Sequence, residues 1–227
     1  MAISVGGQVF DAASTVAREE YEMVGGRQTR AIRITGLVRG ATDLAELIET
    51  LDSIARSASE VVPAKVYLRE GRRLFARREG FSRELSARSR VGCFVLDLRA
   101  DDAWEESEAL HESPWDIGFS GATIELSNSG NVAAMPVVTL TAESDLELPT
   151  LSDGTRSLTY EGTAPGGATL VFDAALRRVL LDGVDVTPYT TGDFPQLAPG
   201  NTTLEYTGDP SGSHFASGVV AFRDRWW

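Results

Sequence analysis

The sequence predicts a mainly β protein with one helix, organised as an α+β N-terminal domain followed by a C-terminal β-sandwich of jelly-roll type. Three observations predict this fold class. One segment near residue 50 has the apolar spacing of an amphipathic helix. Short runs of alternating or β-branched residues fill most of the remaining chain. From residue 117 onward these runs recur at intervals of roughly 8–15 residues, separated by Gly, Pro and Asp, which is typical of a sandwich.

The composition is that of an ordinary globular chain. Of its 227 residues, 42% are hydrophobic and 24% are charged, so the chain can bury a core in each domain. A single cysteine, Cys93, excludes an intramolecular disulfide, and its place in the apolar run 91–96 predicts a buried, inert thiol. The N-terminus has no secretory signal and no run approaches the roughly 20 apolar residues of a membrane span. We therefore expect a soluble product made in the cytoplasm, with no membrane partner.

The N-terminal half contains the one predicted helix. Residues 32–38 alternate as a half-buried strand. Residues 43–57 then carry apolar residues at the spacing of one helical face, namely Leu44, Leu47, Ile48, Leu51, Ile54 and Ala55. Thr42 or Asp43 can cap the first turn, and Asp43 with Glu46 resembles a capping box. We predict a helix over these residues.

The chain returns to β structure after Pro63. Glycines predict hairpin tips at 69–72 and at 78–80, and residues 91–98 predict a long apolar strand. The acidic stretch 100–115 predicts a strand end and an interdomain connection. The predicted domains are therefore residues 1–115 and 116–227.

The C-terminal domain is predicted from short strands and one distinctive turn. Asp182-Gly183 stands between Leu181 and Val184 and predicts a two-residue β-hairpin rather than a calcium loop. Strands are expected near residues 123–126, 137–141, 157–160, 168–172, 179–181, 202–207 and 218–222. The residues expected in or near the core are Phe172, Leu180, Phe194, Leu197 and Leu204.

The chain contains no motif that predicts catalysis. His111 and His214 lack a second ligand at zinc spacing, and a triad of His214 with Asp209 and Ser211 or Ser213 is less plausible than a solvated loop. Residues 105–108 hold three glutamates that could serve a glycosidase but fit an acidic connection better. Phosphate-binding and nucleophile-elbow motifs are absent from the sequence. We expect no catalytic residue, no metal and no cofactor.

Charge is distributed unevenly along the chain. Residues 1–115 hold 16 basic and 19 acidic residues, whereas residues 116–227 hold 5 and 14, giving net charges of −3 and −9. An acidic C-terminal half argues against nucleic-acid binding there. The segment 65–90 holds nine basic and three acidic residues, which fits either a solvated hairpin pair or a subunit contact. The candidate subunit-interface residues are Arg69, Arg72, Arg73, Arg77, Arg78, Trp226 and Trp227; the two tryptophans could instead pack on their own sandwich.

The segment 126–140 has an Asn-Gly turn followed by a Pro-led strand, and 167–185 has a strand, an aspartate and a hairpin. In this order, these motifs resemble one family, the distal tail (Dit) proteins of long-tailed bacteriophages. Residues 194–201 are similar to its Phe…Leu-x-Pro-Gly-x-Asn turn, with Asn directly after Gly here, and 222–227 is similar to its aromatic, basic end. The strand-to-helix step at residues 36–56 is similar to that of the ring-forming domain.

The resemblance implies a tail-tube-like N-terminal domain that forms a hexameric ring, and a galectin-like C-terminal sandwich. It implies a structural protein at the virion tail tip, made in the bacterial host, whose partners are further copies of itself, the tail tube protein and hub or fibre proteins. DNA would pass through the ring without sequence-specific binding. Because contacts with phosphates would slow its passage, we expect most of the arginines of 69–78 to lie at subunit contacts or outer surfaces, away from the channel wall. Their complements on a neighbouring copy would be the acidic segments 19–22 and 101–112.

The alternative is a free-standing lectin-like carbohydrate-binding module. It predicts a monomer with exposed aromatic platforms on a sheet, such as Tyr160, Tyr189 or Tyr206.

Overall fold

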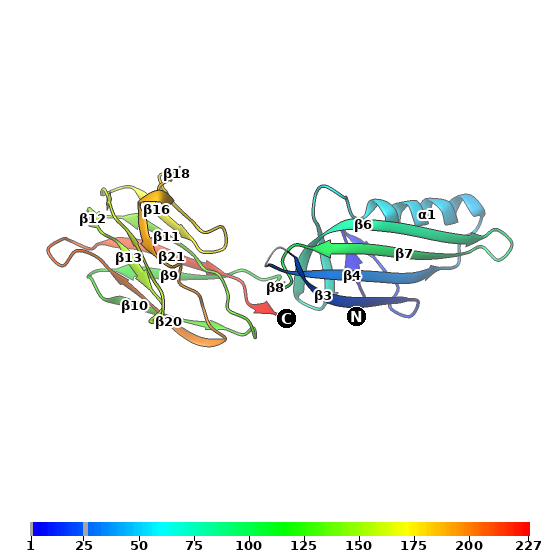
Figure 1. Ribbon diagram of the computed structural model, residues 1–227, viewed down its shortest axis with the longest axis horizontal. Coiled ribbons are helices and arrows are strands. Elements are labelled where there is room, and N and C mark those ends of the chain that lie inside the picture. Colours follow the sequence, from blue (N-terminus) through cyan, green and yellow to red (C-terminus); the bar gives the residue numbers. More distant parts are fainter. Residues whose placement is uncertain (1, 25–26) are drawn as a thin grey trace. The chain divides into compact units, whose positions relative to one another are not determined.

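The computed structural model describes residues 2–24 and 27–227 and divides into two compact units, Met1–Glu108 and Ala109–Trp227 (Figure 1). The sequence placed this division at 115/116. The structure places it earlier because β9 (His111–Ile117) pairs with a strand of the sandwich. Trp115 and Ile117 are each 3% exposed and belong to the core of the second unit. The acidic residues around Trp115 and Ile117 made this segment look like a connection in the sequence and hid its strand-like alternation.

An antiparallel sheet forms the N-terminal unit, with strand order β2-β1-β5-β6-β7-β4-β3 and β8 alongside β6. Strand β3 is the last strand in this order and forms one edge of the sheet. The strands are β1 (Ser4–Val5), β2 (Gln8–Val9), β3 (Thr15–Val24), β4 (Arg27–Val38), β5 (Ala64–Arg69), β6 (Arg72–Ser86), β7 (Val91–Ala100) and β8 (Glu105–Ser107).

The predicted helix is confirmed as α1 (Leu44–Arg56), which lies along the sheet in Figure 1. The Asp43 side chain accepts the Glu46 backbone N–H at 2.8 Å, and the Glu46 carboxylate accepts the Thr42 backbone N–H at 2.6 Å. These two bonds satisfy donors that the first helical turn leaves unpaired. The apolar face of α1 contributes buried Leu47 and Leu51, with Ile54, to the core.

Alternation gives the sheet one buried face and one uncovered face. In β4 and β7 the inward side chains include Ile32, Ile34 and Leu96, each at most 1% exposed. Cys93 lies on the other face and is exposed, so the expected buried thiol is wrong. The apolar run 91–96 looked continuous in the sequence, but only every second side chain of a strand points toward the core.

The two predicted hairpin tips of this unit had different outcomes. The tip at 69–72 is confirmed, with Arg69 opposite Arg72 and Gly71 at φ +69°. The tip at 78–80 is wrong, because β6 continues through it to Ser86. The structure has an irregularity in the β6–β7 register between Arg78 and Gly80 instead. Gly80 therefore marks a bulge, a role that glycine also plays within strands.

Two larger antiparallel sheets form the C-terminal unit, with strand orders β10-β20-β13-β14-β19 and β18-β17-β16-β11-β21-β9, and β12 pairs with β15 in a separate two-stranded sheet. The predicted fold class, mainly β with a single helix, is confirmed. The remaining elements are β10 (Ala122–Asn128), β11 (Val137–Ala142), β12 (Leu146–Glu147), β13 (Thr150–Ser152), β14 (Ser157–Tyr160), β15 (Thr163–Ala164), β16 (Thr169–Asp173), β17 (Arg178–Leu181), β18 (Val184–Asp185), η1 (Thr187–Tyr189), β19 (Thr190–Gly192), β20 (Gly200–Thr207), β21 (Ala216–Phe222) and β22 (Arg225–Trp226).

The core of the sandwich contains most of the residues that the sequence predicted. Phe172, Leu197 and Leu204 are at most 1% exposed, and Phe194 packs against the core while partly exposed. Leu180 is wrong as a core residue. Its neighbour Val179 is 0% exposed and fills the core, so the inward register of β17 is displaced by one position from the prediction.

The Asp182-Gly183 hairpin is confirmed between β17 and β18. Both residues have positive φ, +49° and +80°, as a type I′ turn requires. The Asp182 carboxylate accepts the Thr169 N–H at 2.8 Å and thereby ties the turn to the neighbouring strand. A carboxylate used in this way supports the hairpin interpretation of the motif.

Candidate assembly surfaces

The five candidate arginines of the 69–78 segment lie on β5 and β6, and each forms an ion pair within its own unit. The carboxylates come from the acidic segments that the sequence assigned to a neighbouring copy, and from the loop after α1. The pairs are Arg69 with Glu105 and Glu19, Arg72 with Glu105, Arg73 with Glu106, Arg77 with Asp101, and Arg78 with Glu60. Charge complementarity between these segments is therefore met within one chain.

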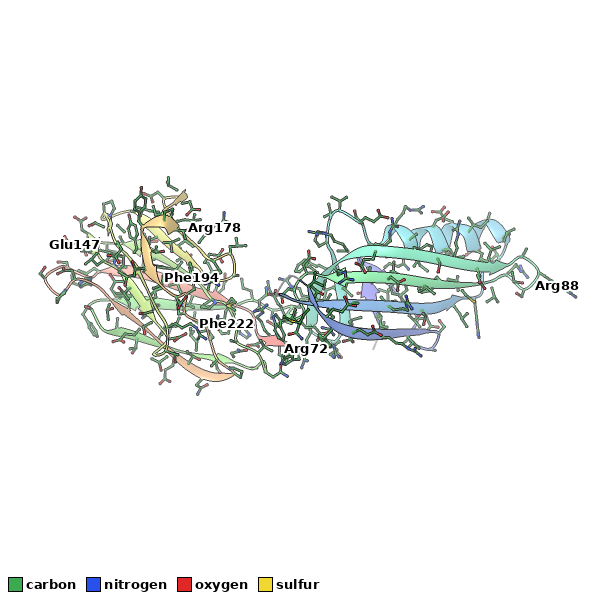
Figure 2. The ribbon with its side chains drawn as sticks, viewed as in Figure 1. Arg72, Arg88, Glu147, Arg178, Phe194 and Phe222 are labelled. Carbon is green, nitrogen blue, oxygen red and sulfur yellow. The ribbon has the colours of Figure 1, made fainter. Side chains whose placement is uncertain are left out.

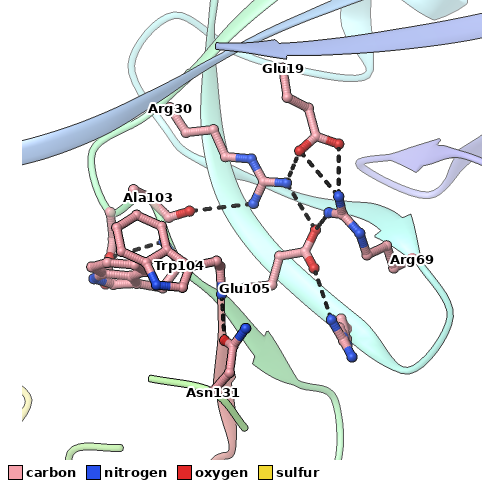
Figure 3. A network of polar contacts seen from close by, with 10 residues as sticks. Glu19, Arg30, Arg69, Ala103, Trp104, Glu105 and Asn131 are labelled. Atoms are coloured by element: carbon pink, nitrogen blue, oxygen red, sulfur yellow. Dashed lines mark hydrogen bonds and ion pairs between the residues drawn. The ribbon is translucent and has the colours of Figure 1, made fainter. Parts of the chain in front are cut away.

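A buried ion network lies at the centre of these pairs (Figure 3). Arg30 is fully buried, contacts Glu19, and donates to Glu105 at 3.1 Å and to the Ala103 carbonyl at 3.3 Å. Arg69 contacts both glutamates, and their charges raise the pKa of its guanidinium against the opposing effect of burial. The network holds the start of β8 to β4 and β5.

Sequence reasoning missed Arg30, although a signal was present. Arg30 has the same parity along β4 as Ile32 and Ile34, so strand alternation directs it into the core. A buried arginine needs carboxylate partners, and Glu19 and Glu105 supply them from distant parts of the chain. The distance in sequence between the three residues hid the network.

The uncovered face of the sheet carries a ladder of paired charges. Arg33 donates to Asp97 at 2.7 Å, and Arg99 contacts Glu22 at 2.9 Å as well as Glu79. Hydrogen bonds to these carboxylates raise the pKa of both guanidiniums. The side chains surround a shallow depression of about 370 Å³. The depression is lined by Arg18, Arg33 and Arg99 and by Glu20, Glu22, Glu79 and Asp97, so carboxylates outnumber guanidiniums there.

Strand β3 forms an exposed edge of the same sheet. It is the terminal strand of the order and pairs along its length with β4 alone among the described strands of that sheet. Val16, Tyr21 and Met23 on β3 are 58%, 42% and 68% exposed. A long edge strand with exposed apolar side chains is a template for pairing with another chain.

The C-terminal segment, residues 225–227, is hydrogen-bonded to its own sandwich. The Arg225 carbonyl accepts the backbone N–H groups of Asn131 and Val132 at 3.0 and 3.1 Å, and the Asn131 side chain accepts the Trp227 N–H at 2.9 Å. A Cβ on Gly130 would lie 2.0 Å from the Arg225 carbonyl oxygen, so glycine permits this approach. Trp226 is half-buried and Trp227 is 47% exposed. Within the C-terminal unit, the backbone of this segment thus has partners of its own.

The residues considered for catalysis are engaged in structural contacts. The His214 ring, 4% exposed, bonds the Tyr206 hydroxyl through Nδ1 at 3.2 Å and the Asp209 carbonyl through Nε2 at 2.6 Å. The Asp209 carboxylate accepts from Ser211, so it does not orient the imidazole as a triad aspartate would. Among the described residues, no group of three or more His, Cys, Asp or Glu is placed to hold a metal ion.

The three glutamates of the 105–108 stretch also have structural partners. Glu105 belongs to the buried network and Glu106 pairs with Arg73. The Glu108 carboxylate accepts the Tyr67 hydroxyl at 2.9 Å. Each of the three carboxylates is thus engaged by another side chain of the N-terminal unit, which is not the arrangement of a glycosidase acid and base.

Two of the three tyrosines named as aromatic platforms for a lectin-like module are buried. Tyr160 and Tyr206 are 8% and 0% exposed and lie in the sandwich core, whereas Tyr189 is 66% exposed. A groove of about 640 Å³ crosses the outer side of β20, with Gln196, Asn201 and Glu205 among its polar lining. No aromatic side chain lines it. No helix of the described chain is long and apolar enough to cross a membrane.

Two of the three comparisons with known proteins found similar proteins. No curated protein sequence matches the chain. The crystal structure of SPP1 Dit (gp 19.1), described as a paradigm of the hub adsorption apparatus in phages infecting Gram-positive bacteria, has a similar fold. The TM-score is 0.70 at 12% identity, over 100% of this chain and 99% of that one. Residues 129–226 match the sequence family "Siphovirus-type tail component, C-terminal domain". Residues 129–226 are therefore similar to the C-terminal domain of siphovirus-type tail components, and the predicted resemblance to distal tail proteins is confirmed.

Proposed function

We propose that this protein is a distal tail protein that joins the tail tube of a long-tailed phage to the host-recognition apparatus at the tail tip. The observation that carries this proposal is the match in fold to SPP1 Dit over essentially the whole of both chains. The family domain at residues 129–226 supports the same function independently at the level of sequence. The role is structural, with further copies of the chain, the tail tube protein and hub or fibre proteins as partners.

The N-terminal unit is proposed to be tail-tube-like and to close a ring of six copies, and the sandwich to be galectin-like. Edge strand β3 is suited to ring closure, because its exposed backbone can pair with a strand of the next copy. Its apolar side chains, Tyr21 and Met23, would lose contact with water on pairing. Most of the arginines Arg69, Arg72, Arg73, Arg77 and Arg78, with Trp226 and Trp227, are proposed to lie at subunit contacts or outer surfaces. Arg77 is the exception, because its register opposite Arg99 places it on the uncovered sheet face, where it pairs with Asp101.

The uncovered sheet face is proposed to line the channel through which DNA passes. Free cations on a channel wall would bind phosphates and slow the passage of DNA. On this face Arg33 and Arg99 are held by Asp97, Glu22 and Glu79, and Arg18 and Glu20 line the same depression. Carboxylates therefore outnumber guanidiniums there, which disfavours the binding of phosphate. Because these guanidiniums are paired with carboxylates, the proposal includes no sequence-specific binding of DNA.

Electron microscopy of tails that contain the protein tests the proposal. We expect a six-fold ring at the distal end of the tube, with α1 outside and the uncovered face inside. Met23→Lys, which places a charge on the β3 edge, should reduce incorporation into tails, whereas Val61→Lys should not. Val61 is 77% exposed in the loop after α1 and serves as the matched control. A tail without such a ring, or a wall formed by Arg69 and Arg72, would overturn the proposal.

A further inference from the structure

Four loops meet at one end of the sandwich. They are residues 118–121 after β9, 143–149 after β11, 161–168 around β15, and 208–215 between β20 and β21. The registers place their strand ends together: Ile117 pairs with Ala216, which also pairs with Ala142. Figure 2 labels Glu147 at this end and Phe222 toward the other. We call these four loops the loop end of the sandwich.

Hydrogen bonds connect the loops of the loop end to one another. Ser120 and Gly208 exchange two bonds, at 3.1 and 3.4 Å, and the Glu147 carbonyl accepts the Asp209 N–H at 3.0 Å. Ser144 Oγ donates to the Ser213 carbonyl at 3.2 Å. Loops bound to one another in this way hold their side chains in a defined arrangement, which lowers the entropy cost of binding a partner.

Phe215 is presented by a backbone that is clamped on both sides. Its N–H donates to Ser144 Oγ at 3.1 Å, and its carbonyl accepts the Glu143 N–H at 2.8 Å. The preceding residue, His214, is buried and bonds Tyr206 and the Asp209 carbonyl. The phenyl ring of Phe215 is nevertheless 50% exposed. A fixed backbone therefore displays an apolar ring to the solvent.

Two further apolar side chains are exposed at the same end, and its charge is acidic throughout. Phe119 is 64% and Leu148 is 39% exposed. The four loops contain Glu143, Asp145, Glu147, Glu161 and Asp209 but no lysine or arginine. Large apolar groups ringed by charge of one sign are typical of a protein-binding surface rather than of random exposure.

We propose that the loop end docks a different tail protein, whose surface offers an apolar pocket for Phe119 and Phe215 rimmed by lysine or arginine. This inference rests on the proposed function. A second copy of the chain fits less well, because Arg69, Arg72, Arg73, Arg77 and Arg78 are already paired within their own unit. A polyanion or an anionic membrane surface is excluded by the carboxylates. The phenylalanines supply the binding energy and the carboxylates supply orientation and speed of association.

Photo-crosslinking in assembled virions tests the docking surface. A benzoylphenylalanine is placed at position 119 or 215 of the full chain, and at Tyr189 as a control. Tyr189 is 66% exposed and lies in η1, outside the four loops. We expect positions 119 and 215 to crosslink to the same tail protein at a peptide that contains lysine or arginine, and position 189 not to do so. Crosslinks to a second copy, or none from particles that contain the chain, would overturn the inference.

Failure of the proposed function gives a different result. If the chain is not a tail component, the Tyr189 control will itself be missing from purified virions. If the chain is present in purified virions but positions 119 and 215 do not crosslink, the docking inference alone is wrong.

Binding of the crosslinked protein, purified, to the full chain gives the energetic test. Phe119→Ala with Phe215→Ala should weaken the affinity by about tenfold or more. Leu176→Ala with Val184→Ala, at positions 60% and 65% exposed elsewhere on the sandwich, should leave it unchanged. Glu143→Gln with Glu147→Gln should lower the association rate and its dependence on salt. Equal effects of the two pairs of apolar substitutions, or a rate that ignores salt, would contradict the proposal.

Discussion

Replacing Glu105 by glutamine tests the buried ion network of the N-terminal unit. The Glu105 side chain is 1% exposed and lies 3.1 Å from a guanidinium nitrogen of Arg30, which is fully buried. Glutamine retains the size and one oxygen acceptor but removes the charge. Removing one partner of a buried pair costs about 3–5 kcal/mol. Glu19 continues to neutralise Arg30, so we expect the lower end of that range, about 3 kcal/mol.

Native-state hydrogen exchange of the full chain, read by mass spectrometry, measures this change. Peptides from β4 and β7 should exchange roughly a hundredfold faster, since about 1.4 kcal/mol corresponds to a factor of ten. Peptides from the sandwich serve as an internal control. Arg30→Met should cost less than Glu105→Gln, because Glu105 would still pair with Arg69 and Arg72.

A surface pair provides the matched comparison. Arg33 and Asp97 are 62% and 33% exposed, so Asp97→Asn should cost no more than about 1 kcal/mol. If Glu105→Gln and Asp97→Asn have equal effects, burial does not set the strength of the network and the reasoning is refuted.

Three further substitutions address the sandwich. Gly130→Ala should destabilise it by about 1–3 kcal/mol, because the new Cβ meets the Arg225 carbonyl, and an unchanged calorimetric melting temperature would exclude that clash. Leu197→Ala, at a site 0% exposed, should cost about 2–5 kcal/mol and clearly more than Leu180→Ala, with urea denaturation showing the difference. Burial raises the pKa of Tyr206 to about 12, so the unfolded phenol ionises first and stability should fall as pH rises from about 10 towards that value; Tyr206→Phe should abolish this part of the pH dependence.

Features fixed by local chemistry could be predicted from the sequence. The cap of α1 depends on residues 42–46, and the turn at Asp182-Gly183 depends on two residues that tolerate positive φ. Both were found where the sequence placed them. Phe172, Leu197 and Leu204 were also predictable, because apolar residues in short strands have few alternatives to the core.

Features set by strand register could not be predicted in the same way. Gly80 signals a turn or a bulge equally well, and only its pairing with β7 decides between them. Leu180 and Cys93 each lie one position out of phase with the buried face, a difference that a continuous apolar run conceals. For the assembly surfaces, the sequence identified the arginines of 69–78. It did not show that carboxylates of the same chain form ion pairs with them.

The pairing of β9 with β21 determines when the sandwich can close. His111 lies opposite Phe222 and Ile117 lies opposite Ala216, so the first strand of this unit waits for one of its last. The N-terminal unit has no such delay, because its strands β1 to β8 all come from the first 108 residues and pair with one another. During synthesis the first unit can therefore fold while the second remains an open chain. Each new copy would present a finished N-terminal unit before its sandwich exists, and exposed edge β3 would be available to neighbours throughout that interval.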